Sequence, residues 1–146
     1  MRTKQVTVTV FTVAFLAFAA SVAAGEPASK SKSALARGKY LVEGVGMCAD
    51  CHSARDEKGE FIKERWLQGA AITFKSTVPM PAWAEAAPPL AGLPGWTDAQ
   101  LVTLLTTGKD QKGEIPEPPM PEYRMTKDDA AAVAAYLASL GAVAGK

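Results

Sequence analysis

Both cysteines and the single histidine of this 146-residue chain fall within five positions, Cys48-Ala49-Asp50-Cys51-His52. Three common uses of paired cysteines explain this cluster poorly. A structural zinc site needs four ligands, and the chain has no other Cys or His. A thioredoxin-like CxxC normally follows a strand, whereas the pattern here predicts a preceding helix. A plain disulfide in an oxidising compartment remains possible but leaves His52 unexplained.

The same residues match CxxCH, the attachment pattern of a c-type haem. At this spacing two thiols can form thioether bonds to the two vinyl groups of the haem. The adjacent imidazole then lies under the iron as its proximal ligand. We therefore expect one haem c, covalently bound through Cys48 and Cys51, with His52 as an iron ligand.

The N-terminus predicts export. Arg2 and Lys4 precede an uncharged apolar run, residues 6–24, which ends in small residues, as in a cleaved signal peptide over residues 1–24. An uncleaved membrane anchor is the alternative, since about 20 apolar residues can span a bilayer. Residues 25–33 are interpreted as a polar linker and 34–146 as the domain. The mature chain has nearly balanced charge, which gives no argument for nucleic-acid binding.

Three helices are predicted in the domain. The first covers residues 33–45 with Ser33 as N-cap. The second covers 97–107, between the N-cap Thr97 and Gly108. The third is an alanine-rich stretch from Thr126 to Gly141, with Thr126 and Asp129 resembling a capping box. Two long Pro-rich loops lie between these helices, and strand signals are few. The fold class is therefore predicted as all-α, with loops that wrap around a cofactor.

The sixth ligand of the iron cannot be a second histidine of this chain. Methionine is the next choice, because a thioether is a soft ligand that favours Fe(II). Met120 is our prediction, since Pro118, Pro119 and Pro121 stiffen its loop and reduce the entropy lost on ligation. Met125 and Met80 are the next candidates. Core packing is the alternative role for any of them.

The ordered set of segments 36–52, 88–101 and 118–140 resembles a class I c-type cytochrome, most similar to single-haem cytochrome subunits or partners of periplasmic dehydrogenases. The resemblance implies that the carbonyl of Pro88 accepts a hydrogen bond from the proximal histidine. It also implies that Met120 is the distal ligand, and that the helix bearing Tyr136 and Leu137 crosses the N-terminal helix. Gly38 would allow the close approach, opposite Ala134 or Ala135.

Residues 53–87 form a longer insertion than the smallest members of that class contain. We interpret it as a hairpin or Ω-loop over a haem edge, and as a candidate docking surface. Its Trp66 and Trp83 are expected to pack, with one of them a candidate indole donor to a haem propionate. Trp96 is interpreted as a core residue.

An iron with both axial positions filled transfers single electrons and has no open position for a substrate. The leading hypothesis is therefore an electron carrier in the bacterial periplasm, or the electron-transfer subunit of a dehydrogenase, and not an enzyme by itself. Its expected partners are a periplasmic dehydrogenase as donor and an oxidase or another cytochrome as acceptor. A membrane is involved only if the N-terminal segment is uncleaved. The alternatives are a haem-based gas or peroxide sensor or weak peroxidase, and a tethered relay in a larger enzyme.

Overall fold

The computed structural model describes residues 31–141, so the predicted signal peptide and residues 25–30 of the predicted linker lie outside the described residues. The elements follow in the order α1 (Lys32–Tyr40), the π-helix η2 (Leu41–Val45), α2 (Ala49–His52), the 3-10 helix η3 (Lys63–Arg65), β1 (Ala70–Ala71), β2 (Ala86–Ala87), α3 (Asp98–Thr107) and α4 (Lys127–Ser139). Within 31–141, no helix has the length and apolar character needed to cross a membrane.

The helical character predicted from the sequence is confirmed, but the predicted all-α class leaves out two short strands that the structure contains. Strands β1 and β2 form a small antiparallel sheet, in which Ala70 pairs with Ala87 and Ala71 with Ala86. An isolated bridge also joins Arg55 to Phe61. Strands of two alanines carry neither the alternation nor the β-branched residues that reveal a strand in a sequence. The predicted insertion, residues 53–87, therefore forms two projecting turns. The Arg55–Phe61 bridge closes the first turn, and the pairing of β1 with β2 closes the second.

The first helix begins earlier than its predicted cap. Ser31, not Ser33, is the N-cap, with extended backbone and a side chain that accepts from the N–H of Ala34 at 3.2 Å. The helix then widens without a break into η2. Gly46 N–H donates to Leu41 O at 2.7 Å and Cys48 N–H to Val42 O at 3.0 Å. A π-turn of this kind is frequent at functional sites, and here it leads directly into the cysteine segment.

Capping fixes the starts of the other two long helices. Thr97 and Gln100 form a reciprocal capping box at α3, and Gly108 ends that helix in the left-handed conformation, as predicted. At α4, the side chain of Thr126 accepts from Asp129 N–H. The Asp129 carboxylate accepts from Arg37 Nε at 2.8 Å. The salt bridge therefore ties the start of α4 to α1.

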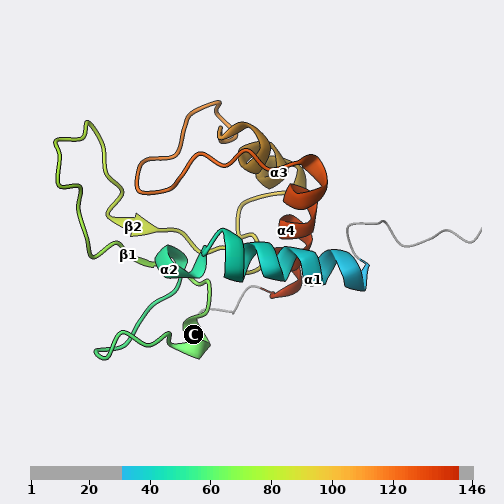
Figure 1. The fold of residues 1–146 in the computed structure, drawn as a ribbon, viewed down its shortest axis with the longest axis horizontal. Helices are drawn as coiled ribbons and strands as arrows, with labels where there is room; N and C mark the ends of the chain where they lie inside the picture. Colours follow the sequence, from blue (N-terminus) through green and yellow to red (C-terminus); the bar gives the residue numbers. More distant parts are fainter. Residues whose placement is uncertain (1–30, 142–146) are drawn as a thin grey trace, which may run out of the picture.

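Helices α1 and α4 cross closely, with α3 packed against α4 (Figure 1). Gly38 lies at the crossing, as predicted, but the atoms of α4 nearest to it belong to Ala132 and Tyr136. A Cβ placed on Gly38 would collide with the carbonyl group of Ala132, because it would lie only 2.6 Å from the carbonyl carbon. It would also lie 2.7 Å from the Cβ of Tyr136. The predicted partners Ala134 and Ala135 are thus wrong. Ala132 and Tyr136 are four residues apart, so they share one helix face.

Replacing Gly38 by Ala is predicted to lower the free energy of unfolding by about 2 kcal/mol, because forced overpacking outweighs the gain in helix propensity. Urea unfolding followed by circular dichroism measures it. Gly44→Ala is the matched control, since its Cβ would meet only the Tyr40 ring, at the ordinary distance of 3.5 Å. Equal stabilities of the two variants would contradict the close crossing.

Candidate functional site

An apolar cavity of about 480 Å³ lies between the cysteine segment, α3, α4 and the Pro-rich loops. Its volume is within the range of roughly 300–1,000 Å³ found for ligand and cofactor sites. The residues that carry chemistry in its wall are Cys48, Cys51, His52 and Met120. The remaining wall is largely apolar and includes Leu90, Leu93, Trp96, Leu101, Leu104, Leu105, Val133 and Leu137.

The two cysteines reach the same cavity because they lie about one helical turn apart. Cys48 is the N-cap of α2, and Cys51 lies inside that one-turn helix. The preceding residue, Met47, adopts a left-handed backbone with φ of 47°, which is unfavourable for a non-glycine residue. This bend between η2 and α2 sets the direction in which Cys48 enters the site. Burial raises the pKa of the Cys48 thiol.

His52 is buried, and its Nδ1 lies 2.7 Å from the carbonyl oxygen of Pro88. Because a carbonyl oxygen can only accept, Nδ1 carries the proton and Nε2 is left with its lone pair. Burial lowers the pKa of His52, and the hydrogen bond to Pro88 opposes this effect. A neutral imidazole with a fixed tautomer is the form that binds a metal.

A buried turn around Leu67 holds Pro88 in place. The N–H of Leu67 donates to the side chain of buried Ser53 at 2.8 Å, and the Leu67 carbonyl accepts from the N–H groups of Leu90 and Ala91.

A close approach of two chain segments at Gly69 adds to this. Gly69 N–H donates to His52 O at 2.8 Å. A Cβ on Gly69 would lie 2.8 Å from Ala87 O, so the chains approach too closely there for a side chain. These contacts fix the position of Pro88 relative to His52.

The structure separates the candidate methionines. Met120 lines the cavity, as does Met47, which is mostly exposed. Met125 is partly buried against the core, and Met80 lines a second hollow, of about 340 Å³, on the turn between β1 and β2. Among residues 31–141, neither Met125 nor Met80 belongs to the wall of the first cavity.

The loop that carries Met120 is held at three points. Ala84 N–H donates to Pro118 O at 2.7 Å, and Met125 N–H donates to Leu105 O at 2.9 Å. Tyr123 Oη donates to Gly46 O at 2.9 Å. Burial, reinforced by the nearby Cys48, raises the pKa of Tyr123 to about 12, so the phenol keeps its proton.

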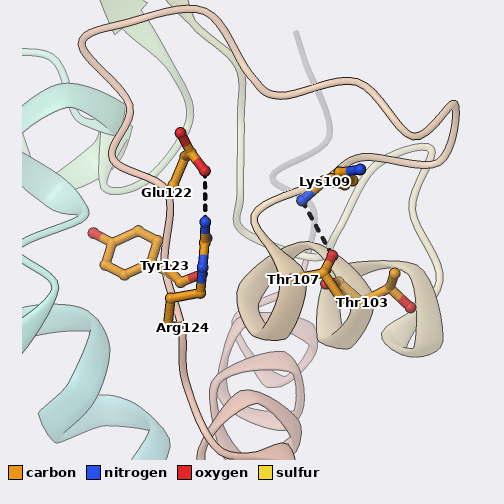
Figure 2. Close-up of polar contacts among 6 residues, drawn as sticks. All are labelled: Thr103, Thr107, Lys109, Glu122, Tyr123 and Arg124. Carbon is orange, nitrogen blue, oxygen red and sulfur yellow. Dashed lines mark hydrogen bonds and ion pairs between the residues drawn. The ribbon is translucent and has the colours of Figure 1, made fainter.

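Sequence reasoning missed Tyr123. The only signal for it is its place three residues after Met120, at the end of the Pro-rich loop. Figure 2 shows it beside the end of α3, with its ring directed away from that helix, next to the ion pair between Arg124 and Glu122.

The tryptophans pack as expected, but within residues 31–141 the indole donor to a propionate is not found among them. Trp96, expected in the core, is partly buried and lines the cavity. The Trp83 indole N–H donates to the Phe74 carbonyl at 3.0 Å, and Trp66 packs edge-to-face on Phe61. Within the part of the chain that the structure describes, neither Trp83 nor Trp66 lines the cavity, so an indole donor to a propionate finds no support.

The donor set and the cavity fit a haem. Two thiols for thioether bonds, an imidazole with a free Nε2 and a thioether sulfur surround one apolar space. Within 31–141, no cluster of three or more His, Cys, Asp or Glu side chains could hold a bare metal ion. The site therefore suits an iron that brings its own planar, apolar ligand.

The family model for cytochrome c matches residues 35–141. The gluconate 2-dehydrogenase cytochrome c subunit of Pantoea cypripedii is 32% identical over 86% of this chain and 30% of that protein. The cytochrome c subunit of the alcohol dehydrogenase (quinone) of Gluconobacter oxydans is 31% identical over 86% of this chain and 28% of that protein.

The crystal structure of the c-type cytochrome SorU from Sinorhizobium meliloti is 19% identical, with a TM-score of 0.41, over 76% of this chain and 94% of that one. The chain spans less than a third of the length of the two dehydrogenase subunits. The match over residues 35–141 takes in the cysteine segment, both Pro-rich loops, most of α1 and the whole of α3 and α4. This chain belongs to the cytochrome c family.

Proposed function

We propose that residues 34–146 are a class I c-type cytochrome domain that holds one haem through Cys48 and Cys51 and transfers single electrons. The observation that carries this proposal is the convergence of Cys48, Cys51, His52 and Met120 on one apolar cavity. These residues come from two segments about 70 positions apart in the sequence. Chance packing of unrelated residues would rarely assemble a complete set of haem ligands.

Each of these residues has a distinct task. Cys48 and Cys51 fix the haem covalently, so it cannot dissociate. His52, oriented by the Pro88 carbonyl, presents Nε2 to the iron as the proximal ligand. Met120 supplies the distal sulfur, and His/Met ligation raises the reduction potential. When bound, the haem supplies an iron centre that accepts one electron and passes on one electron.

The wall of the cavity limits the chemistry to electron transfer. Leu101, Leu104 and Leu105 of α3 and Val133 and Leu137 of α4 line the space with apolar side chains. With the sixth position filled by Met120, no place is left for a substrate to bind the iron. The chain is therefore proposed as a carrier or subunit and not as a catalyst in its own right.

The relatives support a role beside a dehydrogenase. Two of them are named as cytochrome c subunits of a gluconate and an alcohol dehydrogenase. We propose that this chain works in the bacterial periplasm, with a dehydrogenase as electron donor and an oxidase or another cytochrome as acceptor. Residues 1–24 would act as the export signal.

The optical spectrum of the mature protein, produced with a haem-attachment system, tests this function. We expect a low-spin c-type spectrum, a near-infrared sulfur-to-iron band in the oxidised protein, and no prompt response of the reduced protein to carbon monoxide, which can bind only when the sulfur leaves the iron. A prompt spectral shift with carbon monoxide would instead indicate an open sixth position and favour a gas or peroxide sensor, or a weak peroxidase.

Two methionine variants test the distal ligand. Met120→Ala is predicted to abolish the sulfur-to-iron band, permit carbon monoxide binding and lower the reduction potential. Met125→Ala is the matched control, because Met125 packs against the core and lies next to the same loop. It should keep the band and lose about 2 kcal/mol of stability through the cavity left behind. An unchanged band in Met120→Ala would refute the assignment.

A further inference from the structure

The loop carrying Met120 and the segment carrying Cys48 meet through one side chain. Tyr123 Oη donates to Gly46 O at 2.9 Å, although 77 positions separate the two residues. In the part of the chain that the structure describes, no backbone hydrogen bond joins residues 117–125 to residues 44–52. The phenol is therefore the direct polar connection between the two segments that the proposed function places on either side of the iron.

The surroundings of this hydrogen bond leave it little freedom. A Cβ on Gly46 would lie 3.0 Å from Leu41 O, 3.2 Å from Cys48 Sγ and 3.4 Å from Tyr123 Oη. Gly46 is thus enclosed by the π-helix, by the first cysteine and by the phenol. Tyr123 and Gly46 both line the apolar cavity, and the hydrogen bond between them is partly buried, so it lies at the edge of the proposed haem site.

The backbone of Tyr123 is braced from the other side. Arg124 Nη1 donates to Tyr123 O at 2.9 Å, while its Nη2 pairs with Glu122 at 2.6 Å (Figure 2). Met125 N–H is bound to Leu105 O at the end of α3. With its backbone held against α3 and its hydroxyl held by Gly46, Tyr123 spans the gap between α3 and the cysteine segment.

We propose that Tyr123 is a positioning residue that keeps Met120 on the iron. This inference rests on the proposed function, because it assumes ligation by Met120. Met120 lies only three residues from Tyr123. On its other side, within residues 31–141, the backbone hydrogen bond that ties the loop to another segment runs from Ala84 N–H to Pro118 O, while Met120 N–H donates within the loop to Glu117 O at 3.3 Å. Loss of the hydroxyl releases the loop from the cysteine segment. The loop then moves more freely, and the sulfur leaves the iron more often.

Tyr123→Phe tests this role, because it removes the hydroxyl and keeps the ring in the cavity wall. The rate at which carbon monoxide binds the reduced protein reports how often the sulfur leaves. We expect this rate to rise about tenfold, which corresponds to the loss of one hydrogen bond. The sulfur-to-iron band should also disappear at a temperature below that at which circular dichroism shows the helices to unfold.

Tyr136→Phe is the matched control. It removes the Tyr136 hydroxyl, which donates to the Glu43 carboxylate and so joins α4 to η2. Among the described residues that line the cavity, Tyr136 is not included. This variant should lose stability without a change in the rate of carbon monoxide binding. If Tyr123→Phe and Tyr136→Phe behave alike, with the band lost only on global unfolding, Tyr123 has a structural role alone and the inference fails.

The double variant Tyr123→Phe with Met120→Ala shows whether Tyr123 acts through the methionine. We expect it to bind carbon monoxide at the same rate as Met120→Ala, because the ligand that Tyr123 positions is absent. A faster rate in the double variant would mean that Tyr123 controls access to the cavity, and would overturn the proposal. Failure of the proposed function is a separate result, in which the wild-type protein itself lacks the sulfur-to-iron band.

Discussion

The apolar cavity governs the arrangement of the other elements. Leu101, Leu104 and Leu105 of α3, together with Val133 and Leu137 of α4, belong both to the hydrophobic core and to the cavity wall. Apolar surface gains about 25 cal/mol per Å² when it is removed from water, so these helices pack most favourably around a large apolar group. A covalently attached haem satisfies this requirement, and the stability of the domain is expected to depend on it. The same side chains therefore form part of the hydrophobic core and part of the cavity wall.

The two sides of the cavity are built by different physical means. On the histidine side, the turn around Leu67 joins Ser53, Leu90 and Ala91 by backbone and buried hydrogen bonds, and it holds Pro88 against His52. On the methionine side, a Pro-rich loop carries Met120 with only a few anchors outside it. A rigid side around His52 and a more lightly held side around Met120 would suit the proposed His/Met ligation, because imidazole binds iron more firmly than a thioether does.

Local signals in the sequence predicted local structure well. The caps Thr97 and Thr126 and the terminator Gly108 are where the sequence places them, because capping depends on residues within one turn. Ser31 replaced Ser33 as the first cap, since alternating serines offer two equivalent acceptors and packing decides between them. Gly38 was recognised as a crossing point, but its partners Ala132 and Tyr136 depend on the rotation of α4, which an alanine-rich helix does not reveal.

The sequence by itself indicated the chemistry, because Cys48, Cys51 and His52 fall within five positions and their spacing matches the haem attachment pattern CxxCH. It also determined three long helices. Only the tertiary structure decided that Met120 and Met47 line the cavity while Met125 and Met80 do not. It also decided that Trp96 lines the cavity, unlike Trp66 and Trp83, and that Tyr123 meets Gly46. Contacts between residues tens of positions apart depend on how helices and loops pack together. No pattern within a single segment of the sequence encodes that packing.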